Sequence, residues 1–181
     1  MHPFVAKFNV VLPSVKKWIE ETLEAHAKSA TLVLNSPFTR LQEYLPKDLL
    51  SRSWVVVVPR VPFPPLSQFG LSEFKAMEGM LLDGVTYKDT FFVRDGQQRE
   101  SLYFHELVHV VQWECLGVEN FLLAYGVGLL LYGYQRSPLE QMACQLQGAF
   151  EQRTVSFNLM EQIRQQTDFV WSAAQSYLST T

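Results

Sequence analysis

The segment Tyr103–Trp113 reads YFHELVHVVQW, and it places two histidines, His105 and His109, four residues apart around Glu106. Its apolar residues favour a helix from about Arg99 to Leu116. Four residues turn a helix by about 400°, so both imidazoles leave one face, one turn apart. Two rings placed in this way can bind a single Zn²⁺ at about 2.0–2.1 Å. The segment therefore predicts two metal ligands on one helix.

Glu106 lies about 100° around this helix from His105, which puts it beside the metal rather than on it. A carboxylate there can take a proton from water whose pKa the zinc lowers towards about 7. The alternative is a core helix that happens to carry two satisfied histidines. Three polar side chains among Phe104, Leu107 and Val108 would be costly to bury without partners, which favours the metal interpretation.

Two histidines leave a catalytic zinc site one protein ligand short, since such sites usually have three. The other two histidines, His2 and His26, show no pairing pattern and are expected at the surface. Cys115 lies about 120° around the helix from His109. Cys115 and Cys144 are therefore interpreted as ordinary buried thiols.

The better candidate for a third ligand is Glu140, in the segment QRSPLEQMA at positions 135–143, which is expected to begin another helix. A competing role is local. Ser137 and Glu140, with Pro138 at the first helical position, form a capping-box pattern in which the glutamate serves its own helix end. The residues alone leave both roles open.

The N-terminal half contains the strand patterns. Trp54–Val58 is a continuous apolar run rich in valine, which is typical of a strand buried on both faces. Asp83–Gly84 separates Met80–Leu82 from Val85–Tyr87, and this dipeptide predicts a tight hairpin between them. A further short strand is expected at Thr90–Val93.

Helical patterns dominate elsewhere. A first helix is expected to begin at Ser14, and the histidine helix to end at Gly117, a natural C-terminal cap. Later helices are expected from Ser137–Pro138 and over Val155–Leu178. Strands early and helices late favour a single α+β domain spanning residues 1–181.

The most apolar stretch, Phe121–Tyr134, spans about 21 Å as a helix against a hydrocarbon thickness of about 30 Å. A buried core helix is therefore favoured over contact with lipid, and no membrane span is predicted. Met1–Lys7 lacks the pattern of a secretory signal, which predicts a cytoplasmic protein.

Composition narrows the classes of function. The 181 residues are 48% apolar, and 18 acidic against 15 basic residues give a net charge of −3. A nucleic-acid binder is expected to have a basic footprint, so this class is excluded. Two cysteines cannot form a disulfide scaffold, so stability must come from packing.

The motif HELVHVVQ, a tyrosine-rich segment and then SPLEQMA together resemble the small bacterial zinc metallopeptidases of the gluzincin type. The resemblance implies a zincin-like α+β fold with a small N-terminal sheet, an active-site helix and a helical C-terminal part. It implies zinc held by His105, His109 and Glu140, with Glu106 as general base, acting on a peptide or protein substrate. Members often have an aspartate four residues after the ligand glutamate, where this chain has Cys144.

The same resemblance implies that the strands within Met80–Val93 lie beside the cleft, where an edge strand aligns extended peptide. Peptide hydrolysis also needs a group that stabilises the developing oxyanion. Among Tyr132, Tyr134 and Arg136, we expect Tyr134 to fill that role. The loop Arg60–Phe69 is either a rigid surface connection, which is favoured, or a lip of the substrate groove.

Two further hypotheses stay open. The chain could be a non-catalytic binding module with a zinc-stabilised fold, in which the fourth coordination position is filled by the protein. It could also be a membrane-associated protease whose apolar stretch Phe121–Tyr134 contacts lipid. The sequence does not indicate the oligomeric state.

Overall fold

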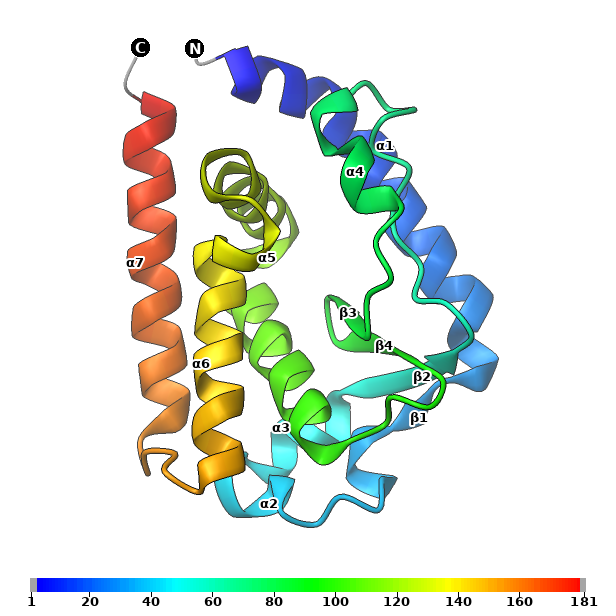
Figure 1. Ribbon diagram of the computed structural model, residues 1–181, viewed down its shortest axis with the longest axis vertical. Helices are drawn as coiled ribbons and strands as arrows, with labels where there is room; N and C mark the ends of the chain where they lie inside the picture. The colour runs from blue at the N-terminus through cyan, green and yellow to red at the C-terminus, as the bar shows by residue number, and fades with distance from the viewer. Residues whose placement is uncertain (1–2, 180–181) are drawn as a thin grey trace.

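A small four-stranded sheet and a larger helical part make up the computed structural model, which describes residues 3–179 (Figure 1). The strands are β1 (Thr31–Leu32), β2 (Trp54–Val58), β3 (Gly84–Tyr87) and β4 (Thr90–Arg94). The long helices are α1 (Pro3–His26), α5 (Glu100–Tyr132), α6 (Pro138–Gln152) and α7 (Leu159–Ser179). The short helices are α2 (Leu41–Tyr44), α3 (Lys47–Arg52) and α4 (Lys75–Glu78). The α+β class and the helical C-terminal part agree with the prediction.

The sheet has the strand order β1-β2-β4-β3. The central strands β2 and β4 are parallel, with Val56 opposite Phe92, and both outer pairs are antiparallel. The proline-rich loop and α4 provide the connection from β2 to β3. This order leaves β3 at one edge of the sheet, next to α5.

The predicted hairpin at Asp83–Gly84 is wrong. The hairpin is formed by β3 and β4, and its turn contains Lys88, which takes the left-handed conformation at φ 59°. Gly84 is the first residue of β3 and Met80–Leu82 lies outside the sheet. Asp83 instead fixes the start of the ladder, because its carbonyl accepts from the Arg94 amide at 2.8 Å and its carboxylate binds the Arg94 side chain.

The strand at Trp54–Val58 forms as predicted, but its expected burial on both faces is wrong. Trp54 is 37% exposed and Val57 is 43% exposed. The helical layer reaches the sheet through α5, which packs against β3 and β4 rather than against β2. Because Trp54 and Val57 are three apart in the strand, their side chains lie on opposite faces, so neither face of β2 is completely covered.

Helix α1 begins at Pro3, well before the predicted start at Ser14, and Pro13 lies inside it. A proline inside a helix removes one main-chain hydrogen bond and disfavours the preceding turn. Phe8 and Val11 are nevertheless buried in the core, so tertiary packing outweighs the local preference. The last helix, α7, begins at Leu159, four residues later than expected.

The helical run of α5 is interrupted at Gly117, where φ is 69° and ψ is 173°. The predicted break is confirmed, but the chain resumes the helix at once and no loop separates the two parts. Figure 1 shows the chain changing direction within α5. The first part, residues 100–116, carries both histidines, and the second part, residues 118–132, leads back towards the start of α6.

By length and hydropathy alone, α5 is the one helix within residues 3–179 that could cross a membrane. This is weak evidence, because the core helix of a soluble protein passes the same test. In this fold α5 packs against α6 and α7, but only 33% of its most apolar window is buried, and Leu130, Leu131 and Tyr132 at its end are exposed.

Replacing Gly117 with Ala is expected to lower the free energy of unfolding by about 1–3 kcal/mol, because only glycine readily adopts these dihedral angles. Gly148 is the matched control, since it lies within α6 with open space around its Cβ position. Gly148→Ala should raise stability by about 0.5–1 kcal/mol. Urea unfolding of the two variants measures both effects, and an equally stable Gly117→Ala protein would contradict the need for the break.

Candidate metal centre

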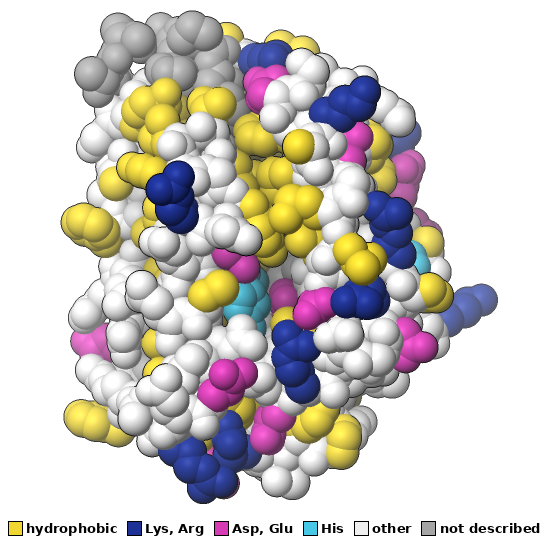
Figure 2. All heavy atoms as spheres, viewed as in Figure 1, with side chains coloured by type: hydrophobic (Ala, Val, Ile, Leu, Met, Phe, Trp, Pro, Cys, Tyr) yellow, Lys and Arg dark blue, Asp and Glu magenta, His cyan; other side chains and the backbone are white. Residues whose placement is uncertain are grey.

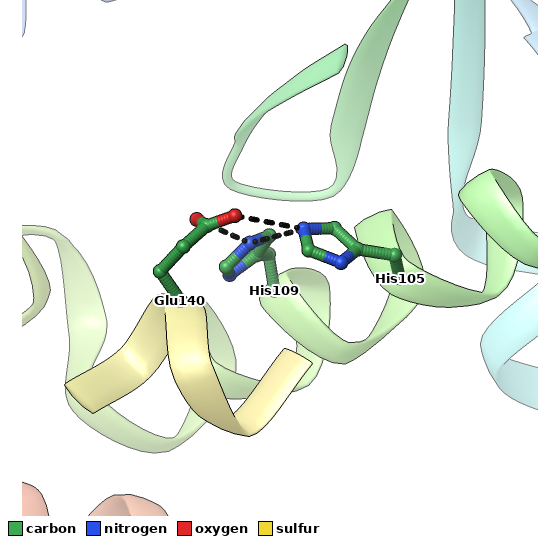
Figure 3. A group of neighbouring side chains, drawn as sticks. All are labelled: His105, His109 and Glu140. Atoms are coloured by element: carbon green, nitrogen blue, oxygen red, sulfur yellow. Dashed lines mark hydrogen bonds and ion pairs between the residues drawn. The ribbon is translucent and has the colours of Figure 1, made fainter. Parts of the chain in front are cut away.

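Three buried side chains from two helices lie close together: His105 and His109 from α5 and Glu140 from the first turn of α6 (Figure 3). The Nε2 atoms of the two histidines lie 3.1 Å apart. One carboxylate oxygen of Glu140 lies 3.3 Å from Nε2 of His105, and the other lies 3.3 Å from Nε2 of His109. All three predicted ligands are therefore brought together.

These distances fit a tetrahedral metal ion. Ligand atoms at 2.0–2.1 Å from a tetrahedral zinc ion are separated from one another by about 3.3 Å. The two nitrogens lie 3.1 Å apart and each lies 3.3 Å from a different Glu140 oxygen, so that one ligand atom from each residue lies within 4.8 Å of the others. Two imidazole nitrogens and one carboxylate oxygen are also a donor set that zinc accepts. The three side chains could hold one ion with little rearrangement.

Gln112 fixes the orientation of His109. The carbonyl oxygen of Leu139 can only accept, so the Gln112 amide nitrogen at 3.1 Å must donate to it. The Gln112 side-chain oxygen then faces Nδ1 of His109 at 2.8 Å, and this nitrogen must carry the proton. With this proton on Nδ1, the Nε2 atom of His109, which faces His105 and Glu140, is the nitrogen left to bind a metal.

The same glutamine connects the two ligand helices. Gln112 lies on α5 one turn after His109, while Leu139 lies on α6 directly before Glu140. Gln112 is fully buried, so water does not compete for its hydrogen bonds. The sequence reasoning left the residues that orient the ligands unassigned, although Gln112 stands inside the quoted HELVHVVQ motif.

The capping box at the start of α6 does not form. Ser137 makes no side-chain cap, and its hydroxyl is buried without a hydrogen-bond partner among the described residues. The Glu140 side chain turns to the histidines instead. A Cβ atom on Gly128 would lie 2.7 Å from the Ser137 hydroxyl, so this glycine allows the second part of α5 to approach α6 closely.

Two tyrosines lie beside Glu140. The Tyr125 hydroxyl donates to a Glu140 oxygen at 3.3 Å, a contact that sequence reasoning missed because Tyr125 was read as part of an apolar core helix. Tyr134, the predicted residue, lines the same cavity. Burial and the nearby Glu140 carboxylate raise the pKa of each tyrosine well above its ordinary value, so both phenols stay protonated.

Glu106 is held against strand β3. Its Oε2 atom accepts a hydrogen bond from the Thr86 hydroxyl at 2.7 Å, and a Cβ atom on Gly84 would collide with its carboxylate. Gly84 is therefore required for space rather than for a turn. Burial raises the pKa of Glu106, and the neighbouring imidazoles and the Thr86 hydroxyl only partly offset this. A general base is most effective when its pKa lies near the working pH, so a raised pKa makes a carboxylate a better base.

The electrostatics of the cluster favour a positive charge between its members. Burial by itself would raise the pKa of Glu140, but its contacts with the two imidazoles outweigh this and hold the pKa well below its ordinary value. Burial likewise would lower the pKa of His105, but contacts with Cys144 and nearby carboxylates raise it well above its ordinary value. A proton or a cation is stabilised at the same place.

The remaining candidates lie outside the cluster. Cys144 is exposed rather than buried, and its sulfur lies 3.8 Å from a Glu140 oxygen because it follows Glu140 by one turn on the same face of α6. Cys115 is only partly buried. His26 donates from Nδ1 to the Thr22 carbonyl, 2.8 Å away, and His2 lies outside the described residues. Tyr132 and Arg136 do not line the cavity beside the cluster.

An apolar cavity of about 110 Å³ opens beside the cluster. It contacts both histidines, Glu106 and Glu140, and the Arg60–Phe69 loop contributes Phe63 and Pro64 to its wall. The loop is tied to β3 by a hydrogen bond from the Tyr87 hydroxyl to the Pro62 carbonyl at 2.9 Å. Figure 2 shows hydrophobic side chains gathered in the hollow of this face, with a histidine at its end.

Comparison of the chain with protein-family models, with curated proteins and with solved structures finds no match.

Replacing Gln112 with Leu is expected to weaken zinc binding by about 10- to 100-fold, because His109 loses the partner that sets its tautomer. Competition with a chromophoric chelator measures the affinity. Gln141→Leu is the matched control, since Gln141 is exposed on the same helix as Glu140. Equal zinc affinity in the two variants would show that Gln112 serves only the core.

Proposed function

We propose that this protein is a zinc-dependent peptidase of zincin-like fold that hydrolyses peptide bonds. The observation that carries the proposal is the cluster of His105, His109 and Glu140 at coordination spacing, with Glu106 buried at its side. This arrangement supplies three ligands and a general base around one point, as metal-assisted hydrolysis requires. The resemblance of the HELVHVVQ and SPLEQMA segments to gluzincins supports the same activity.

Zinc held by the two imidazoles and the carboxylate would act as a Lewis acid and lower the pKa of water. Glu106 takes the proton of the attacking water and then delivers it to the leaving amine. Its hydrogen bond from Thr86 and the close backbone of Gly84 hold the carboxylate in one position. This fixed orientation lowers the entropic cost of proton transfer.

Stabilisation of the oxyanion falls to a tyrosine. Tyr134 and Tyr125 both line the cavity, and each keeps its phenolic proton because its pKa is raised. A protonated phenol can donate a hydrogen bond to the developing negative charge. The side chains of Tyr125 and Tyr134 both interact with Glu140, so either phenol could serve, and Tyr134 is the one that the sequence predicts.

Strand β3 is suited to align an extended peptide. It forms the edge of the sheet beside Glu106, and its ladder with β4 begins with the Arg94 amide donating to Asp83. Because antiparallel pairs alternate, the main-chain groups of Gly84 and Thr86 face away from β4. The Thr86 carbonyl accepts from the Trp113 indole, which leaves Gly84 as the main anchor for substrate.

Replacing Glu106 with Gln is expected to keep zinc bound and to lower kcat by about 10²- to 10⁴-fold, because only the proton transfer is lost. The measurement is cleavage of an unfolded protein by the zinc-loaded enzyme, with chelation and zinc readdition as a check. Glu151→Gln, an exposed change on α6, is the matched control. Turnover that survives in Glu106→Gln would refute the mechanism, and zinc without turnover in the wild type would favour a binding module.

Replacing Glu140 with Ala is expected to remove one of three ligands and with it most of the bound zinc. Elemental analysis of the purified protein beside the Glu140→Ala and Glu151→Ala variants measures this loss. Equal, stoichiometric zinc in all three proteins would leave the third ligand unassigned. The cytoplasmic location expected from the sequence stays a prediction that the zinc measurement does not test.

A further inference from the structure

We infer that the cavity beside the metal cluster binds one large apolar side chain of the peptide substrate, aromatic or branched aliphatic, next to the bond that is cleaved. This inference rests on the proposed function, because it concerns the substrate of the same site. It states which substrate side chain the site prefers, a property that neither the metal ligands nor the general base determines.

The lining of the cavity is almost entirely apolar. Apart from the residues of the cluster and Glu106, its wall consists of aliphatic and aromatic side chains with Thr86 and two glycines. Representative members are Phe63, Leu66, Phe74, Leu82, Phe121 and Leu129. A peptide side chain that enters the cavity removes its own apolar surface from water, and this contributes about 25 cal/mol of binding free energy for each Å² buried.

Segments far apart in the sequence build this wall. Phe8 and Val15 come from α1, Phe63 from the proline-rich loop, and Leu122 and Leu129 from the second part of α5. Val15 is buried, and the loop is fixed to β3 through Tyr87. Because several elements shape it at once, the cavity is part of the packed fold rather than a gap at one flexible loop.

The size of the cavity agrees with one side chain. An apolar cavity of about 150 Å³ holds a molecule of benzene. The volume here is about 110 Å³, which suits a single ring or a branched chain beside the cluster. The cavity reaches His105, His109 and Glu140, so its occupant would sit within one residue of the scissile bond.

Charged side chains are excluded by the same lining. No lysine or arginine is among the described residues that line the cavity, so an acidic side chain would find no counter-charge. The carboxylates present, Glu106 and Glu140, are engaged by Thr86 and by the two histidines. A basic side chain would therefore be buried without a free partner, at a large cost in desolvation.

Two hydroxamates of equal length test the preference by binding, one with a benzyl and one with a carboxymethyl side chain. Calorimetric titration of the zinc-loaded wild type should give about 10- to 100-fold tighter binding of the benzyl compound. Phe63→Glu should abolish this preference, and so should Leu122→Glu on another wall. Phe157→Glu, a fully exposed change between α6 and α7, should leave it intact.

Cleavage of a peptide library with one varied residue on each side of the scissile bond provides the second measurement. Preference for Phe, Leu, Ile or Met at one of these positions supports the inference. Equal binding of the hydroxamates, tighter binding of the carboxymethyl compound, or no binding of either would overturn it.

The two measurements separate the two proposals. Peptide cleavage without preference for an apolar neighbour would refute the cavity assignment and leave the peptidase proposal standing. Tight, selective binding of the benzyl hydroxamate with no cleavage of any peptide would refute the peptidase and retain the apolar cavity.

Discussion

The contact between the Glu140 carboxylate and two imidazoles one turn apart sets the conditions for the rest of the structure. All three side chains are buried, and an isolated buried charge is costly. Their mutual contacts offset that cost and fix how α5 and α6 meet. Gln112 adds a second connection, since one amide holds both His109 and the main chain before Glu140. The contacts that hold the three side chains of the cluster together therefore also determine how α5 packs against α6.

Much of this site could be predicted from the sequence because it depends on local periodicity. Two histidines at a spacing of four on an apolar helix must share a face, and the structure places them so. The role of Glu140 could not be decided from its neighbours, since the capping box and the metal site use the same residues. Contacts across the fold decided it: Gly128 brings α5 close to Ser137, and the serine makes no cap.

The errors in the fold also have tertiary causes. Asp83–Gly84 has the composition of a turn, yet Gly84 is needed because Glu106, 22 positions later in the chain, occupies the space of its Cβ atom. Pro13 lies within a helix because Phe8 and Val11 are drawn into the core. Tyr125 had no distinguishing signal in an apolar run. Each case reflects a long-range contact that outweighs the local preference, and no periodicity reports such contacts.

The break at Gly117 divides α5 into two parts with different surroundings. Residues before it carry the histidines and most of them are buried, whereas residues after it, such as Leu122 and Leu129, add apolar side chains to the wall of the cavity. Substitutions at Leu122 or Leu129 can reshape what the cavity accepts, whereas Tyr125 and Gly128 in the same part contact Glu140 and Ser137. The metal ligands on α5 thus precede Gly117, while apolar residues that contact a substrate side chain follow it. Selectivity for substrate can therefore change through substitutions in residues 118–132.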